Sequence, residues 1–165
     1  MHREGRGERD MGLFLGTHIN KVDKKGRVSV PSQFRLALAD QGFPGIILYP
    51  SLSLPGVVEG CGMAYLEKIA SASASQMEVF SPQQDDLAAV IYGRSVQLLW
   101  DTEGRVVLPE QLVSHVGITE QVAFVGMGVR FQLLLPQANV TRDAEASARL
   151  QKNPPKLTFQ KPEGT

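Results

Sequence analysis

The sequence has 165 residues, of which 42% are apolar, and its 17 basic and 17 acidic residues give a formal net charge of zero. This length and composition suit one domain, or two small halves that share a core, and exclude a wholly disordered chain. Zero net charge excludes nucleic-acid binding by bulk attraction, so such binding would depend on a local basic patch or on an oligomer that repeats one.

The N-terminal segment, residues 1–11, is charged and glycine-rich and ends at a second methionine. It lacks the apolar stretch of a signal peptide, and we predict that it is a disordered extension. No later segment approaches the roughly 18 apolar residues of a membrane span. The single cysteine, Cys61, excludes an intrachain disulfide and fits a reducing compartment, so we expect a cytoplasmic protein.

The first structural unit begins with the stretch "VDKKGRVSVP". Its aspartate, Asp23, can accept N–H bonds at the head of a turn, and Gly26 supplies a position with positive φ, as in a bulged hairpin. The alternation that follows predicts a strand, and Pro31 suits the first turn of a helix that Gly42 would close. A further strand is predicted in the apolar run at residues 45–52.

A second stretch, "WDTEGRVVLP", repeats this pattern 78 positions later. Six of thirteen aligned positions are identical, which shared composition would not produce, so the chain is predicted to contain a tandem repeat. The second unit continues with a helix from Pro109 to Gly117 and two strands within residues 122–136, around a Gly-Met-Gly turn. The identical pairs are Asp23/Asp101, Gly26/Gly104, Arg27/Arg105, Val28/Val106, Pro31/Pro109 and Gln33/Gln111.

Two helices are predicted between the units, at residues 63–76 and 81–93, with Ser81 as the N-cap of the second. A last helix is predicted from Thr141 to Gln151. The expected organisation is a first repeat with its following helix at 12–76, a helix with the second repeat and the last helix at 77–152, and a flexible tail at 153–165.

These motifs resemble those of the MraZ family, bacterial transcriptional regulators with a duplicated AbrB-like fold. The resemblance extends from Gly12 to Leu150, whereas the N-terminal extension and the loop "PSLSLPGVVEGCG" depart from the family pattern. It rests on four segments in this order: "LFLGTHINKVDKKGRVSVPSQFR", "ILYP", "YGRSVQLLWDTEGRVVLPEQL" and "VAFVGMGVRFQLL".

The resemblance implies a mainly β fold with short helices, of the α+β class. Two tandem AbrB-like halves with swapped hairpins would form a pseudo-twofold β-barrel. It also implies a ring-shaped homo-oligomer that regulates transcription. The ring would bind short direct repeats of double-stranded DNA in the promoter of the cell-division and cell-wall gene cluster, so we expect a nucleoid-associated protein.

The residues expected to contact DNA gather around the first repeated turn. The family's Asp-x-x-x-Arg motif falls on Asp23 with Arg27 and on Asp101 with Arg105, and the family's DNA contact is attributed to the neighbourhood of Lys25. Residues 21–27 carry four cations against one anion, whereas Arg105 stands beside two acids. A turn needed only for folding would not require lysines, and phosphate-facing turns favour cations. The predicted DNA-binding residues are Lys21, Lys24, Lys25, Arg27 and, with a weaker contact, Arg105; the predicted structural residues are Asp23, Gly26, Pro31, Asp101, Gly104 and Pro109.

Other functional classes find less support in the sequence. The histidines His2, His18 and His115 are scattered and form no metal-binding motif, and no nucleophile elbow or dinucleotide fingerprint is present. We therefore predict a protein that is not an enzyme and needs no cofactor. Two alternatives stay open: the repeated turn is only a folding device, or the protein is an assembly module that binds protein alone. The family is also associated with a methyltransferase encoded beside it, which is a candidate partner.

Overall fold

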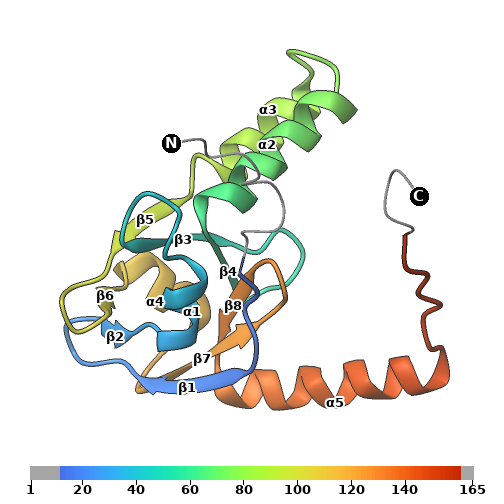
Figure 1. Ribbon diagram of the computed structural model, residues 1–165. Coiled ribbons are helices and arrows are strands. Elements are labelled where there is room, and N and C mark those ends of the chain that lie inside the picture. The colour runs from blue at the N-terminus through green and yellow to red at the C-terminus, as the bar shows by residue number, and fades with distance from the viewer. Residues whose placement is uncertain (1–11, 161–165) are drawn as a thin grey trace, which may run out of the picture.

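A computed structural model describes residues 12–160, so the predicted disorder of residues 1–11 lies outside the described part. The described residues form eight strands and five helices (Figure 1). The first half contains β1 (Thr17–Lys21), β2 (Arg27–Ser29), α1 (Ser32–Ala37), β3 (Gly45–Pro50), β4 (Val58–Cys61) and α2 (Met63–Gln76). The second half contains α3 (Pro82–Ile91), β5 (Val96–Leu99), β6 (Arg105–Val107), α4 (Glu110–Val116), β7 (Gln121–Gly126), β8 (Phe131–Leu134) and α5 (Pro136–Lys152).

Two antiparallel sheets carry the fold. Six strands follow the order β1-β7-β8-β4-β3-β5, and β2 pairs with β6 in a separate ladder. The mixed α+β class with short helices is therefore confirmed. The six-strand order is symmetric about its centre. The strands at one end, β1, β7 and β8, are equivalent to those at the other end, β5, β3 and β4, because each pair holds the same position in its repeat.

Strands from different halves pair with one another. Strand β1 of the first half pairs with β7 of the second, and β2 pairs with β6. The prediction that β1 and β2 pair as a hairpin is therefore wrong, because each pairs with a strand of the other half. The turn between them is still closed by a hydrogen bond from the Asp23 N–H to the Arg27 carbonyl at 3.0 Å. The two turns also clasp the opposite half, because the Gly26 carbonyl accepts from Leu108 and the Gly104 carbonyl accepts from Val30.

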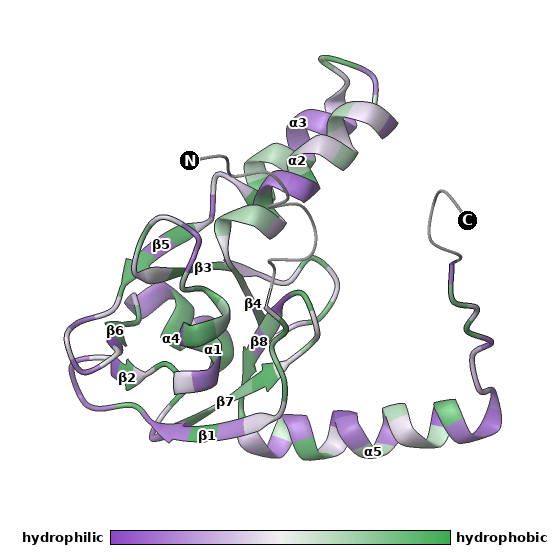
Figure 2. Ribbon diagram, viewed as in Figure 1, coloured by the Kyte–Doolittle hydropathy of each residue, from purple (hydrophilic) through white to green (hydrophobic). Residues whose placement is uncertain are grey.

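An aromatic cluster fills the centre of the core. Phe34 of α1 is fully buried and lies edge-on to Phe14, with ring centroids 5.2 Å apart, and near Phe131 of β8 at the same distance. Strand β3 is buried on both faces: Ile46 and Leu48 join this core, while Ile47 and Tyr49 face the bases of α2 and α3. Burial on both faces explains why β3 reads as a continuous apolar run (Figure 2).

Several predicted helices are confirmed. Helix α4 begins after Pro109 and ends at Gly117, whose φ of 83° gives the left-handed cap that the sequence indicated. Helix α2 has the predicted bounds, and the Ser81 hydroxyl accepts from the Gln84 N–H at the start of α3.

Two predicted helix ends are wrong. Helix α1 ends at Ala37 with Leu38 as its C-cap, not at Gly42, because the backbone continues in tighter turns, in which the Ala39 N–H donates to the Leu36 carbonyl at 3.2 Å. Helix α5 begins at Pro136, five residues before the predicted start, because this proline occupies the first helical turn instead of ending a strand.

The C-terminal residues 153–160 form neither helix nor strand and are exposed, and the rest of the predicted tail lies outside the described part. Across residues 12–160, no helix is both long and apolar enough to cross a membrane.

Candidate nucleic-acid interface

The carboxylate of Asp23 organises the first repeated turn. Its Oδ1 accepts from the backbone N–H of Lys25 at 3.0 Å and of Arg27 at 2.8 Å, while Oδ2 accepts from Arg27 Nε at 2.6 Å. Gly26 has a φ of 84°, and a Cβ on it would lie 2.8 Å from the Leu108 carbonyl oxygen. The turn therefore needs both the acid and the glycine in these positions.

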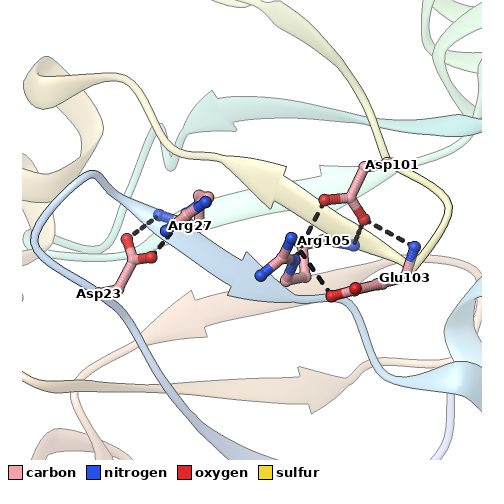
Figure 3. A network of polar contacts seen from close by, with 5 residues as sticks. All are labelled: Asp23, Arg27, Asp101, Glu103 and Arg105. Atoms are coloured by element: carbon pink, nitrogen blue, oxygen red, sulfur yellow. Dashed lines mark hydrogen bonds and ion pairs between the residues drawn. The ribbon is translucent and has the colours of Figure 1, made fainter.

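The second turn repeats this geometry. Oδ1 of Asp101 accepts from the backbone N–H groups of Glu103 and Arg105 at 2.9 and 3.0 Å, and Oδ2 accepts from Arg105 Nε at 3.1 Å (Figure 3). Gly104 has a φ of 80°. The sequence repeat thus corresponds to a repeat of the local structure.

Both aspartates are held in their ionised form. The backbone N–H of Arg27, followed by its side chain, lowers the pKa of Asp23 below its ordinary value, and the backbone N–H of Arg105 does the same to the pKa of Asp101. A carboxyl with a depressed pKa in the folded state stabilises that state above its ordinary pKa. The contribution is lost as the pH falls through the folded-state pKa.

The β2–β6 ladder brings the two arginines onto one exposed face. Val28 and Val106 are cross-strand partners and both are buried, so the alternating neighbours point the other way. Those neighbours are Arg27 opposite Val107, and Arg105 opposite Ser29. The arginines are therefore diagonal neighbours with Cα atoms about 7–8 Å apart, and Figure 3 shows them on adjacent strands.

The two arginines differ in how their terminal nitrogens are used. Nη2 of Arg105 lies 3.2 Å from a Glu103 carboxylate oxygen. Lys25 occupies the equivalent position in the first turn, and within residues 12–160 the ion pair of Arg27 is with Asp23, through Nε. The planar end of Arg27 can therefore donate to an outside acceptor, while that of Arg105 is partly engaged.

A groove of about 750 Å³ adjoins the first turn. It brings together four of the five residues predicted to bind DNA, Lys21, Lys24, Arg27 and Arg105, whereas Lys25 is exposed on the turn outside it. No ion pair within the described residues engages the three lysines. The remaining residues that line the groove are Val22, Asp23, Val28, Ser29, Thr119, Glu120 and Gln121.

Known proteins resemble this chain over most of its length, although no protein-family model matches it. A protein named Transcriptional regulator MraZ from Parvibaculum lavamentivorans is 44% identical over 140 residues, which cover 85% of this chain and 86% of that protein. A protein of the same name from Rickettsia bellii is 42% identical over 150 residues, covering 90% and 97%, and one from Rickettsia peacockii is 42% identical over 127 residues, covering 77% and 84%. The chain belongs to the MraZ family. The predictions of a transcription regulator and of a protein that is not an enzyme are confirmed by this membership.

Sequence reasoning missed part of the groove in this MraZ-family chain. Thr119, Glu120 and Gln121 precede and begin β7 in the second half, far in sequence from the first turn. They reach the groove because Lys21 pairs with Gln121 and the Val22 N–H donates to the Glu120 carbonyl at 2.8 Å. No signal within either repeat reveals this pairing, since it joins the two halves.

Cys61, His18 and His115 lie outside the groove. Cys61 is buried, and burial raises the pKa of its thiol to about 12, so it stays protonated at neutral pH. The ring of His18 packs edge-on to Phe34, while His115 lies in the last turn of α4. Among residues 12–160, no cluster of His, Cys, Asp or Glu could hold a metal ion.

Proposed function

We propose that this chain is a sequence-specific DNA-binding transcriptional regulator. It acts as a ring-shaped homo-oligomer on short direct repeats in the promoter of the cell-division and cell-wall gene cluster. The observation that carries this proposal is the exposed face of the β2–β6 ladder, on which two arginines lie beside a basic groove. An arginine pair of this kind can donate to guanine edges, while nearby lysines bind phosphates.

The balance of charge in the groove favours an anionic ligand. Four cations and two acids line it, and one of the acids, Asp23, is already paired with Arg27. Lys24, Lys25 and Arg27 provide most of the affinity in this proposal, and Arg105 makes a weaker contact because Glu103 engages it. This local patch compensates for the zero net charge of the whole chain.

Assembly into a ring strengthens a weak single contact. One turn with three or four cations binds weakly at physiological salt, and several copies on one ring raise the effective concentration for adjacent DNA repeats. Each subunit would be a pseudo-twofold barrel of two AbrB-like halves with swapped hairpins, divided at residues 12–76 and 77–152. The pairing of β1 with β7 and of β2 with β6 supports this architecture.

The cellular setting follows from the same proposal. A promoter-binding ring would work in the cytoplasm in association with the nucleoid, without a cofactor, and a methyltransferase encoded by an adjacent gene is a candidate protein partner. The alternative is an assembly module that binds protein only. In that case the basic turn would have no DNA ligand.

A gel-shift experiment with the DNA upstream of the chain's own gene, at two salt concentrations, tests the proposal. The Lys24→Ala/Lys25→Ala variant should bind much more weakly, and the slope of log affinity against log salt should decrease by about 0.9 for each phosphate that the variant no longer neutralises. The matched control is Thr102→Ala/Glu103→Ala at the equivalent positions of the second turn, which should bind at least as well as the wild type. Absence of any shift by the wild type at low salt would favour the protein-only module.

A further inference from the structure

Two projections leave the body of the molecule at different places (Figure 1). One is the helical hairpin α2–α3, whose base packs on β3 through residues such as Ile91. The other is α5 with the residues that follow it. We call residues 77–86 the tip and residues 149–160 the arm. Neither α2 nor α5 contains a buried residue, so most of both projections is exposed.

The tip combines acidic and apolar groups. It contains Glu78, Asp85 and Asp86 and no basic residue. Val79 and Phe80 are 69% and 89% exposed. Phe80 has a φ of 61°, which a non-glycine residue rarely adopts, and its N–H donates to Gln84 Oε1 at 3.1 Å. The backbone therefore holds a large apolar ring out in solvent.

The arm combines basic and apolar groups. It contains Arg149, Lys152 and Lys156 and no acidic residue. Leu157 and Phe159 are 85% and 95% exposed. No ion pair within the described residues engages any charge of the tip or the arm. Each surface thus has the charge and the apolar groups that the other would accept.

The start of α5 is fixed to the sheet. The carboxylate of buried Glu59 accepts from Gln132 Nε2 at 2.8 Å and from Arg130 Nε at 3.1 Å. Arg142 of α5 donates to the Gln132 side chain and, at 2.9 Å, to Asn139 Oδ1. This chain of hydrogen bonds sets the direction in which α5 carries the arm away from the sheet.

We propose that the arm of one copy binds the tip of a second copy. This inference rests on the ring-shaped oligomer of the proposed function and names the surfaces that build it. The two surfaces are different parts of one chain, so the contact is heterologous and repeats head to tail, which generates a ring when the rotation closes. Opposite charges select the partner surface, and the exposed Phe80, Leu157 and Phe159 supply apolar area.

A charge-swap experiment tests this interface by light scattering on full-length protein. The tip-reversed variant is Glu78→Lys/Asp86→Lys; Asp85 is kept because its charge favours the N-terminus of α3. The arm-reversed variant is Lys152→Glu/Lys156→Glu. Each variant alone should lose the wild-type oligomer mass, because like charges then meet. An equimolar mixture should regain it, since the basic tip of one variant meets the acidic arm of the other.

Several outcomes overturn this inference. If both variants keep the wild-type mass, or if the mixture stays at the single-chain mass, the arm does not bind the tip of another copy. Asp40→Lys, an exposed reversal outside both surfaces, is the control and should keep the wild-type mass. A wild type that is itself a single chain would overturn the ring as well, whereas a ring that is insensitive to the swap overturns the interface alone.

A second variant separates assembly from folding. Phe80→Gly places at this position a residue that adopts a positive φ without strain, so the chain should unfold no more easily than the wild type. Because the variant also lacks the exposed ring, its oligomer should dissociate at a protein concentration at least tenfold higher than that of the wild type. An unchanged oligomer would exclude Phe80 from the interface. DNA binding through Lys24 and Lys25 at low salt should persist in this variant, which keeps the test independent of the basic turn.

Discussion

At the scale of single residues, each repeated arginine combines a structural role with an outward-facing group. Nε of Arg27 is bonded to Asp23, which fixes the side chain on the exposed face of β2. The hydrogen bonds to Asp23 use Nε and the backbone N–H of Arg27, so N–H donors on the terminal nitrogens stay available. The motif therefore pre-positions a donor pair, so less side-chain entropy is lost when a ligand binds.

The first prediction concerns the ionisation of Asp23. Its pKa should lie below the ordinary value of 3.8 and should rise towards it in Arg27→Ala. The rise should be partial, because the backbone N–H of residue 27 is the largest cause of the depression and survives the substitution. Carboxyl ¹³C NMR titration measures this pKa, and Asp101 in the same sample should be unchanged. Since the pKa is depressed, the turn's contribution to stability should decrease as the pH falls below about 4.

The second prediction compares three glycines with positive φ. Gly26→Ala should lower the free energy of unfolding by about 2 kcal/mol or more, because it adds the left-handed strain of about 1–2 kcal/mol to a Cβ clash with the Leu108 carbonyl. Gly104→Ala should have a smaller effect, since the three atoms nearest to its Cβ belong to the Arg35 guanidinium, which can move, and not to the backbone. A Cβ added at Gly42 would meet nothing within 4 Å, so Gly42→Ala should reflect the left-handed backbone strain alone. Urea denaturation at fixed protein concentration gives the three values; equal effects would contradict the role of the neighbouring atoms.

At the scale of elements, the sequence predicted those helix ends that depend on interactions between residues close together in the chain. The cap of α3 at Ser81 and the end of α4 at Gly117 depend on bonds within a few residues, and both were predicted from the sequence. The end of α1 was missed because tighter turns replace the helix after Ala37, whereas the glycine with positive φ that the sequence indicates comes later, at Gly42. The start of α5 was missed because Pro136 suits both a strand end and a helix start.

The third prediction concerns the cap of α3. The Ser81 hydroxyl accepts from the Gln84 N–H at 3.2 Å, so Ser81→Ala should lower the free energy of unfolding by about 1 kcal/mol. Ser75→Ala is the matched control, because Ser75 lies inside α2 and its hydroxyl bonds only the Ala72 carbonyl. Alanine is favourable there, so this variant should be neutral or more stable. Thermal denaturation followed by circular dichroism compares the two, and an equal loss in both would contradict a capping role.

At the scale of the whole molecule, the family resemblance implied that the two halves exchange hairpins, but the sequence did not provide the register in which their strands pair. The repeat was visible in six identical residues, but the β2–β6 ladder that puts both arginines on one face depends on pairing between segments 78 positions apart. The same limit hid Glu120 and Gln121, which join the groove only through β1–β7 pairing. The basic character of the first turn was predictable, because charge is a property of composition and needs no fold.

The last prediction tests the difference in charge between the two turns, which share one backbone geometry. Thr102→Lys/Glu103→Lys gives the second turn the charges of the first and raises the net charge by three at a backbone that already has the same geometry. It also removes the carboxylate 3.2 Å from Arg105, whose terminal nitrogen then becomes available. DNA affinity at low salt should therefore increase, and the slope of log affinity against log salt should steepen by about 0.9 for each additional phosphate that the variant neutralises. Gel shifts at several salt concentrations measure both quantities. Asp40→Lys, which reverses an exposed acid outside the groove, controls for a general increase in charge and should change the slope less. If the two variants behave alike, the turns matter only through bulk charge, and the shared face of the β2–β6 ladder has no special role in binding.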